Sequence, residues 1–236
     1  MLCAVMQPTY LPWAGYFALI DLVDIFMFYD DAQFSKSSWH YRNQILCAQD
    51  KKWLSLDIIH HHGQSLNETK LALLNKNIRV HKNTITTYYG KSPHYQDANE
   101  LMVYLSENSC DNLAQLNIKL IKFICHKLKL DTVFIKSSDY SISGERSDRL
   151  SKYLEIMKCT QYLSPIGAKE YLQEDNILEA KYPTTYCDFI PPSYCQENSK
   201  DNFISHLCII DVIANLGWEN TSKYIRNMSC QIKNIN

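Results

Sequence analysis

The chain has 236 residues and a formal net charge of −1, and 46% of its residues are apolar, 12% aromatic and 21% charged. A charge this close to zero argues against a protein that binds nucleic acid through a basic face. The apolar and aromatic content excludes a disordered chain, and the length is enough for one sizeable hydrophobic core. We therefore expect a globular protein with a single domain over residues 1–236.

The start of the chain and its cysteines indicate the compartment. The sequence lacks the basic start and long apolar run of a secretory signal, and no apolar window approaches the ~20 residues of a membrane-spanning helix. The nine cysteines are an odd number, with no Cys-x-x-Cys pair among them. We expect reduced thiols, which are typical of a cytoplasmic protein, and no membrane span.

The N-terminal segment predicts a βαβ unit. Residues 2–6 and 25–29 are short apolar runs typical of buried strands, and residues 16–23 carry apolar side chains at helical spacing. Pro8 and Pro12 predict a loop between the first strand and the helix. The two strands should pair in parallel because a helix connects them.

The middle of the chain predicts a hairpin followed by helices. Residues 44–48 and 53–59 flank a polar turn and have the pattern of two hairpin strands. Helical patterns cover residues 75–89 and 111–130, and another helix begins after Ser92-Pro93. The helix-rich stretch from about residue 70 to about residue 130 predicts an insertion or cap.

Strands and helices alternate again toward the C-terminus. The pattern predicts, in chain order, a strand at 132–136, a helix at 145–158, a strand at 161–163 and helices at 168–172 and 205–216. Ser205 would cap the last helix, and Asp211 would be half-buried there with a partner. The order predicts an α/β fold with a mainly parallel, Rossmann-like sheet flanked by helices.

Polar and aromatic side chains are concentrated after the first two predicted strands. This edge of a parallel sheet is where ligands bind. The loop after the first strand carries Gln7, Tyr10, Trp13, Gly15 and Tyr16, and the loop after the second carries Asp30, Asp31, Gln33, Ser35, Trp39, Arg42 and Asn43. The aromatic rings can stack on a sugar or a base, although clustered aromatic residues also build cores. We expect the cleft between these two loops to be the active site.

Three charged side chains in the second of these loops could take part in catalysis or bind a charged ligand. Adjacent carboxylates such as Asp30 and Asp31 can accept substrate hydroxyls, hold a metal or act as a general base. The planar fork of Arg42 suits phosphate or carboxylate. The structural alternative is that the two aspartates cap a turn and pair with Arg42.

The histidines predict no metal site. His60-His61-His62 resembles a metal tract, but His61 would point away from its neighbours in an extended segment, and no cysteine or carboxylate stands at ligand spacing. His81, on a predicted helix, is a candidate for acid–base chemistry, and a structural role is the alternative.

A second candidate binding element is the strand–loop–helix junction formed by Ser164, Gly167, Ala168 and Lys169. The free N–H groups of a helix N-terminus beside a glycine can hold an anion. A plain strand-to-helix connection is the alternative.

Three stretches of the sequence resemble the WbqC-like protein family, and together they span almost the whole chain. The first stretch runs from Met6 to Phe17 and continues through Asp24, residues 29–35, Ser38-Trp39 and Arg42-Asn43. The second comprises Arg149-Leu150, residues 162–164 and residues 167–172, and the third comprises residues 205–211 with Asn215 and Gly217. Two positions depart from the family's pattern, which commonly has histidine in place of Met6 and proline in place of Cys195.

The resemblance implies work on the sugars of a surface polysaccharide, such as O-antigen lipopolysaccharide or capsule. It implies a transferase that forms an amide on the amino group of a nucleotide-linked amino sugar, by acyl or aminoacyl (for example glycyl) transfer. Asp30, Asp31 or a histidine such as His81 would take the ammonium proton, while Arg42 and the 164–168 turn would hold the diphosphate. The other residues expected at the substrate site are Gln7, Tyr10, Trp13, Gly15, Tyr16, Gln33, Ser35, Trp39, Asn43, Lys169, Tyr171 and Ser205.

The expected partners follow from this reaction. They are the nucleotide-linked amino sugar and an acyl or aminoacyl thioester donor, carried by coenzyme A or a carrier protein. A homo-oligomer is compatible with the sequence, and no nucleic acid is expected.

Two alternatives differ in their chemistry. The first βαβ unit is also similar to that of nucleotidylyltransferase-like ligases such as pantothenate synthetase, which would make the reaction ATP-dependent. Those enzymes have His-x-Gly-His at the loop–helix junction, which here reads Pro12-Trp13-Ala14-Gly15-Tyr16. The other alternative is a non-catalytic protein that binds sugar nucleotides or serves as a scaffold.

Overall fold

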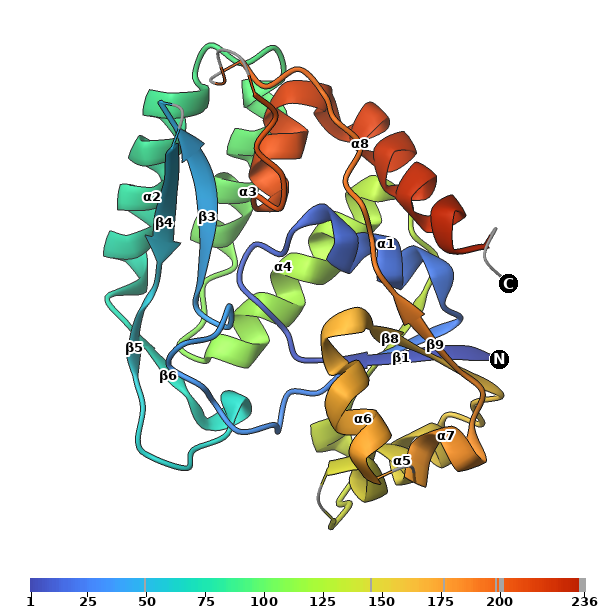
Figure 1. Ribbon diagram of the computed structural model, residues 1–236. Coiled ribbons are helices and arrows are strands. Elements are labelled where there is room, and N and C mark those ends of the chain that lie inside the picture. The colour runs from blue at the N-terminus through green and yellow to red at the C-terminus, as the bar shows by residue number, and fades with distance from the viewer. Residues whose placement is uncertain (49, 145, 176, 198, 200–201, 234–236) are drawn as a thin grey trace.

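A parallel sheet is the centre of the fold. The computed structural model describes residues 1–48, 50–144, 146–175, 177–197, 199 and 202–233. Within these ranges, five strands form the sheet in the order β7-β2-β1-β8-β9, and every neighbouring pair is parallel (Figure 1). The strands are β1 (Leu2–Met6), β2 (Ile25–Phe28), β7 (Val133–Lys136), β8 (Gln161–Pro165) and β9 (Thr184–Cys187). The predicted α/β class and the parallel pairing of the first two strands are confirmed.

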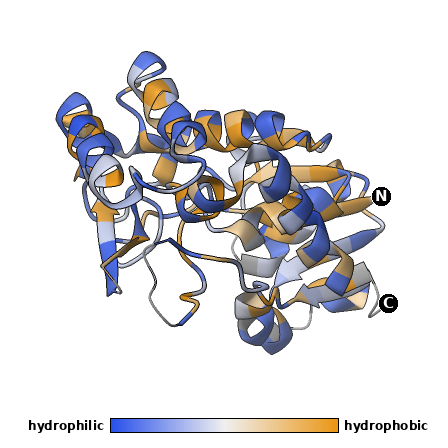
Figure 2. Cartoon of the chain, turned by 90° about the horizontal axis from the view of Figure 1, so that it is seen from above, coloured by the Kyte–Doolittle hydropathy of each residue, from blue (hydrophilic) through white to orange (hydrophobic). Residues whose placement is uncertain are grey.

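Both faces of the sheet are covered, which explains why its strands are apolar runs. Successive side chains of a strand point to opposite faces. Accordingly Ala4, Phe26 and Phe28 belong to one hydrophobic cluster, whereas Cys3 and Met27 belong to a second. The first cluster includes residues of α1 (Ala14–Leu22), α4 (Leu113–Leu128) and α8 (Ile209–Lys233), and the second includes residues of α5 (Arg146–Ile156), α6 (Lys169–Asp175) and α7 (Ile177–Lys181). Figure 2 shows hydrophobic and hydrophilic residues alternating along the helices, as expected when one side of each helix faces a core.

The segment between β2 and β7 carries most of the remaining elements. It contains the antiparallel pairs β3 (Arg42–Cys47) with β4 (Asp50–Ser55) and β5 (Asp57–Ile59) with β6 (Lys70–Ala72), then α2 (Leu74–Tyr89), α3 (Tyr95–Glu107) and α4. The predicted helices and a hairpin are therefore present. The second hairpin strand begins at Asp50, inside the predicted turn, and residues 57–59, predicted as part of that strand, pair with β6 instead. Buried residues of α2 and α3 belong to the same cluster as those of α1 and α8, so this segment extends the main core.

The C-terminal part differs from the prediction. The last helix begins at Ile209, not at residue 205, and continues to Lys233 with a break at Gly217 (φ 72°, ψ 171°). The helix does not begin earlier because Cys208 N–H donates to the Gln44 carbonyl (2.8 Å) and Ile209 N–H to the Pro12 carbonyl (2.9 Å), and because His206 has a left-handed backbone (φ 60°). Ser205 therefore caps no helix. Strand β9 and helix α7 were not predicted, since both are short and β9 lies at the sheet edge.

The strand order creates a topological switch point. The chain moves from β1 outward to β2 and β7, then crosses to the other side of β1 to form β8 and β9. Strands β1 and β8 pair only at their amino ends, through Leu2 with Gln161 and Cys3 with Tyr162. Their carboxyl ends thus separate where ligands bind in sheets of this kind. Within the described residues, no helix is both long and apolar enough to span a bilayer.

Candidate functional site

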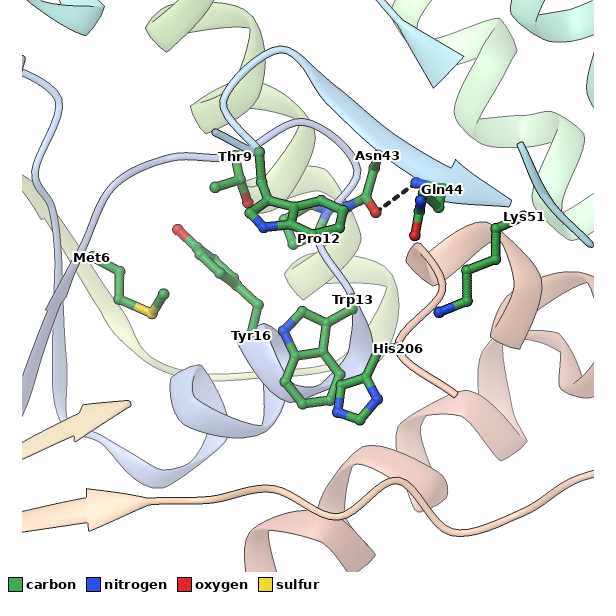
Figure 3. A pocket seen from close by; sticks show the side chains of 10 residues that line it. Met6, Thr9, Pro12, Trp13, Tyr16, Asn43, Gln44, Lys51 and His206 are labelled. Carbon is green, nitrogen blue, oxygen red and sulfur yellow. Dashed lines mark hydrogen bonds between the residues drawn. The ribbon is translucent and has the colours of Figure 1, made fainter. Parts of the chain in front are cut away.

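Three cavities adjoin one another along the carboxyl edge of the sheet, and we call them together the groove. The aromatic cavity, of about 530 Å³, is lined by Met6, Thr9, Pro12, Trp13, Tyr16, Trp39, Asn43, Gln44, Lys51 and His206 (Figure 3). The connecting cavity, of about 200 Å³, shares Met6, Trp13, Tyr16 and His206 and adds residues such as Gly15, Pro165 and Asp188. The switch-point cavity, of about 420 Å³, lies between β1 and β8 and includes Met6, Gln7, Tyr29, Ser164, Gly167 and Ala168. Met6, the last residue of β1, lines all three.

Buried amides hold the first loop in its shape. Asn43 Nδ2 donates to the carbonyls of Tyr10 (3.2 Å) and Leu11 (2.7 Å), and Leu11 has a left-handed backbone (φ 46°). Asn117 Nδ2 donates to the carbonyls of Pro8 (3.1 Å) and His40 (2.7 Å). The side chain of Asn117 therefore holds the loop after β1 and the loop after β2 in a fixed position relative to each other. Asn43 reaches the aromatic cavity but uses its amide on the backbone.

Tyr10 and His81 form a buried pair below the groove. The Tyr10 hydroxyl donates to Nδ1 of His81 (2.9 Å), and Nε2 of His81 donates to the Ser55 carbonyl (3.1 Å). Burial lowers the pKa of His81 to about 4, so its imidazole is neutral at pH 7. Both residues are almost fully buried and line none of the three cavities. This geometry gives them structural roles in place of the stacking and acid–base roles expected from the sequence.

Asp30 and Asp31 likewise face away from the groove. Asp30 is buried and accepts hydrogen bonds from Ser137 Oγ (3.1 Å), Ser138 N–H (3.0 Å) and Ser138 Oγ (2.7 Å). Asp31 accepts from Ser137 and forms an ion pair with Arg149. The pair thus joins the loop after β2 to the 3-10 turn η2 (Ser137–Asp139) and to α5. Neither carboxylate is placed to take a proton from a ligand in the groove.

Arg42 pairs with neither aspartate. Its guanidinium lies 4.4 Å from the ring centroid of Trp53 and donates to the Ser37 carbonyl (3.3 Å). Trp53 in turn packs on Trp39, with ring centroids 5.1 Å apart. Of these three side chains, Trp39 lines the aromatic cavity.

The remaining predicted residues divide between the groove and the surface. Gln7, Trp13, Gly15, Tyr16, Ser164, Gly167 and Ala168 line one or more of the cavities. Gln33 and Ser35 are exposed, and Gln33 forms a single bridge with Ser65. The Lys169 ammonium lies 5.7 Å from the ring centroid of Tyr186. Tyr171 belongs to α6, and its side chain is outside the described part of the structure. Ser205 is half-exposed beside the groove, and its hydroxyl lies 2.8 Å from Nδ1 of His206.

His206 is a residue of the groove that sequence reasoning missed, as are Gln44 and Lys51. His206 is exposed, it has a left-handed backbone (φ 60°), and its ring stacks on Trp13 with centroids 4.6 Å apart, as Figure 3 shows. Its Nδ1 is bonded to Ser205, and within the described residues Nε2 has no hydrogen-bond partner. No local motif marks it, because its neighbours in the groove come from the N-terminal loop and from β4.

The surroundings of His206 favour its neutral form. Although the residue is exposed overall, its ring packs against Trp13, and this partial burial lowers its pKa below the ordinary value. The Lys51 ammonium lowers the pKa further, while the Asp188 carboxylate opposes both. The imidazole is therefore available as a base at neutral pH.

Gln7 presents an amide to the switch-point cavity. Its Oε1 lies 3.0 Å from Nε2 of His40, whose other ring nitrogen is buried without a partner. Burial lowers the pKa of His40 to about 4, so the ring carries one hydrogen at pH 7. A buried N–H without an acceptor costs more than a bare ring nitrogen, which places the hydrogen on Nε2, donating to Gln7. The NH₂ group of Gln7 then remains for a ligand.

A model of the WbqC-like protein family matches residues 7–223. The chain belongs to this family. The uncharacterized protein Rv1507c of Mycobacterium tuberculosis is 30% identical over 190 residues, which cover 79% of this chain and 81% of that protein. No solved structure matches the chain. The resemblance drawn from the sequence is thus confirmed.

One departure from the WbqC-like pattern falls at the centre of the groove. Met6, where the family commonly has histidine, is the residue shared by all three cavities. A thioether can neither take nor give a proton at neutral pH. In this member of the family, the titratable imidazole of the groove is supplied by His206, which lines two of the same cavities.

A methyl group on Gly15 should displace the Trp13 indole. A Cβ atom there would lie 2.2 Å from two indole atoms, whereas a Cβ on Gly167 would meet no atom within 4 Å. We expect Gly15→Ala to lower the free energy of unfolding by about 1–3 kcal/mol through overpacking, and to alter tryptophan fluorescence. Gly167→Ala, the matched control, should stay within about 0.5 kcal/mol of wild type. Equal urea midpoints for the two variants would contradict this packing of Trp13.

Proposed function

We propose that this protein forms an amide on the amino group of a nucleotide-linked amino sugar during the biosynthesis of a surface polysaccharide. Membership of the WbqC-like family is compatible with a biosynthetic enzyme. The observation that carries the proposal is His206, a neutral imidazole with an unpartnered Nε2 at the junction of two cavities. Such a junction can hold an amine on one side and an acyl group on the other.

The reaction needs a base and a donor for developing charge. The sugar amine, once deprotonated, attacks the acyl carbonyl, and the C–N bond forms as the bond to the thiolate leaving group breaks. His206 would take the ammonium proton and release it to solvent, and would then take the second proton that the nitrogen loses as the C–N bond forms. The imidazolium would give this second proton to the leaving thiolate, so the products are the amide and a thiol. The Gln7 NH₂ group lines the switch-point cavity and could stabilise the tetrahedral oxyanion.

Product analysis tests the proposal. The purified protein would be incubated with a panel of nucleotide-linked amino sugars and acyl-coenzyme A or glycyl thioesters, with and without ATP. Mass spectrometry should detect a product heavier than the sugar nucleotide by one acyl or glycyl group. No product from any nucleotide-linked amino sugar, under conditions where the protein is folded, would refute the proposal.

An ATP-dependent ligase is the second candidate, and the position of α1 favours it. Gly15 and Tyr16, in the first turn of α1, line the connecting cavity, so the amino end of this helix faces the groove after a proline-containing loop. A helix amino end favours a bound phosphate. The two candidates differ in stoichiometry: the ligase releases AMP and diphosphate for each amide formed, and the thioester transferase consumes no ATP.

Substitution of Lys51 and substitution of Asp188 should shift the pKa of His206 in opposite directions. Lys51→Met removes a charge that lowers this pKa, so the pKa should rise; Asp188→Asn removes a charge that raises it, so the pKa should fall. Lys52→Met is the control, because adjacent strand residues point to opposite faces. NMR titration of the His206 imidazole measures all three. Shifts in the same direction for Lys51→Met and Asp188→Asn would contradict the arrangement.

A further inference from the structure

Trp39, which lines the aromatic cavity, packs on Trp53, and Trp53 packs on Arg42. Trp39 and Trp53 are 46% and 40% exposed, and their ring centroids are 5.1 Å apart with an interplanar angle of 37°. Arg42 lies against Trp53 at 4.4 Å and is anchored on the Ser37 carbonyl. Two adjacent exposed tryptophans expose apolar area of the kind that marks a binding surface. Because Arg42 packs against Trp53 and is itself hydrogen-bonded to the backbone, the two tryptophan rings are held in place; we call Trp39 and Trp53 the tryptophan platform.

The cavity beside this platform holds unused polar groups. Thr9, Gln44 and Lys51 line it, and within the described residues no hydrogen bond or ion pair is present for their side chains. Figure 3 shows Lys51 and Met6 at opposite ends of the cavity, with Tyr16 and Trp13 between them. Lys51 lines the same cavity as Trp39 and His206 and supplies it with a positive charge.

We propose that the aromatic cavity binds the nucleoside diphosphate of the sugar substrate, with its base stacked on Trp39, which packs on Trp53, and its diphosphate beside Lys51. The proposal rests on the proposed function for the identity of the substrate. Stacking suits any base because every base has a flat π-face, and an ammonium balances the diphosphate charge. The volume of about 530 Å³ lies in the range of small-ligand sites.

This orientation explains the rest of the groove. The sugar would point away from the platform, toward Trp13 and His206, which form the boundary with the connecting cavity. The acyl donor would approach from the connecting and switch-point cavities. Arg42 was expected from the sequence to bind phosphate but packs against Trp53 instead. In this proposal the Lys51 ammonium binds the diphosphate.

Equilibrium binding of UDP, dTDP, GDP, CDP and ADP, measured by calorimetry and tryptophan fluorescence, tests the site. Trp39→Leu and Trp53→Leu should each weaken binding of the preferred diphosphate about tenfold, and Trp53→Tyr should restore most of the affinity. Lys51→Met should weaken binding and reduce its salt dependence. Trp218→Phe, a tryptophan on α8 away from the groove, is the matched control and should bind like wild type.

Three outcomes would overturn the inference: no diphosphate binds, the leucine variants bind like wild type, or only adenine nucleotides bind. The test is separate from that of the proposed function. Tryptophan-dependent binding of UDP or another diphosphate without amide formation would refute the function and keep the site. Amide formation on a nucleotide-linked amino sugar with a KM that Trp39→Leu and Trp53→Leu leave unchanged would refute the site and keep the function.

Discussion

Replacing His206 by glutamine should lower kcat/KM for amide formation about 10² to 10⁴-fold, the usual contribution of a general base. Glutamine keeps a planar polar group beside Trp13 but cannot take a proton. The wild-type rate should fall as pH drops through the pKa of His206, which burial and Lys51 hold below the ordinary histidine value. That acidic limb should be missing from the residual activity of the variant.

His61→Gln is the control for this experiment. His61 is an exposed histidine outside the groove, so the variant should keep both the rate and the acidic limb of wild type. A His206→Gln protein that folds normally and retains the full rate and pH profile would remove His206 from the reaction.

Asp211→Ala should give the largest loss of stability, roughly 3 kcal/mol or more in the free energy of unfolding. Asp211 is fully buried and accepts from the hydroxyls of Tyr89 (2.8 Å) and Tyr194 and from Gln196 Nε2 (2.8 Å). Alanine leaves these three donors without their acceptor. The carboxylate also ties the segment around Tyr194 and Gln196 to α8, so its loss should loosen the approach to His206 as well.

The effect of this substitution should depend on pH. Burial raises the pKa of Asp211 above its ordinary value. A raised folded-state pKa stabilises the fold below the ordinary pKa of about 3.9, and this contribution is lost as pH rises through the folded-state pKa. The difference between wild type and Asp211→Ala should therefore be larger at low pH than at pH 8.

Urea unfolding at several pH values measures this difference. Asp131→Ala, at an exposed position, should change the free energy of unfolding by no more than about 0.5 kcal/mol. An Asp211→Ala protein with the wild-type midpoint at every pH would contradict the structural role of the buried carboxylate.

Local patterns were sufficient for the framework of the fold. The apolar runs of β1 and β2, the prolines between β1 and α1, and the helical spacing of α2 and α4 are set by residues close in sequence, so they were readable without the structure. The same reasoning predicted that polar residues after β1 would stand at the ligand edge, and Gln7, Trp13, Gly15 and Tyr16 do line the groove.

The roles of individual polar residues depended on partners far away in the sequence. Asp30 meets Ser137 and Ser138 at separations of 107 and 108 residues, and Tyr10 meets His81 at a separation of 71. The local sequence around Asp30 would look the same whether its carboxylate accepts hydrogen bonds from distant serines or binds a substrate. The substrate-binding roles of Gln33, Ser35, Lys169 and Tyr171 remain predictions that rest on local sequence alone.

Local sequence patterns were enough to establish the family and the α/β class, and they predict the edge of the sheet where a ligand binds. Only the tertiary structure decided which side chains meet there. Hydrogen bonds from the C-terminal segment to Gln44 and Pro12 bring His206 onto Trp13. The β3–β4 hairpin brings Lys51 into the same groove and Trp53 against Trp39. The physical reason is that hydrophobic periodicity and turn chemistry act between neighbours, whereas a site is made by contacts that form when distant segments pack.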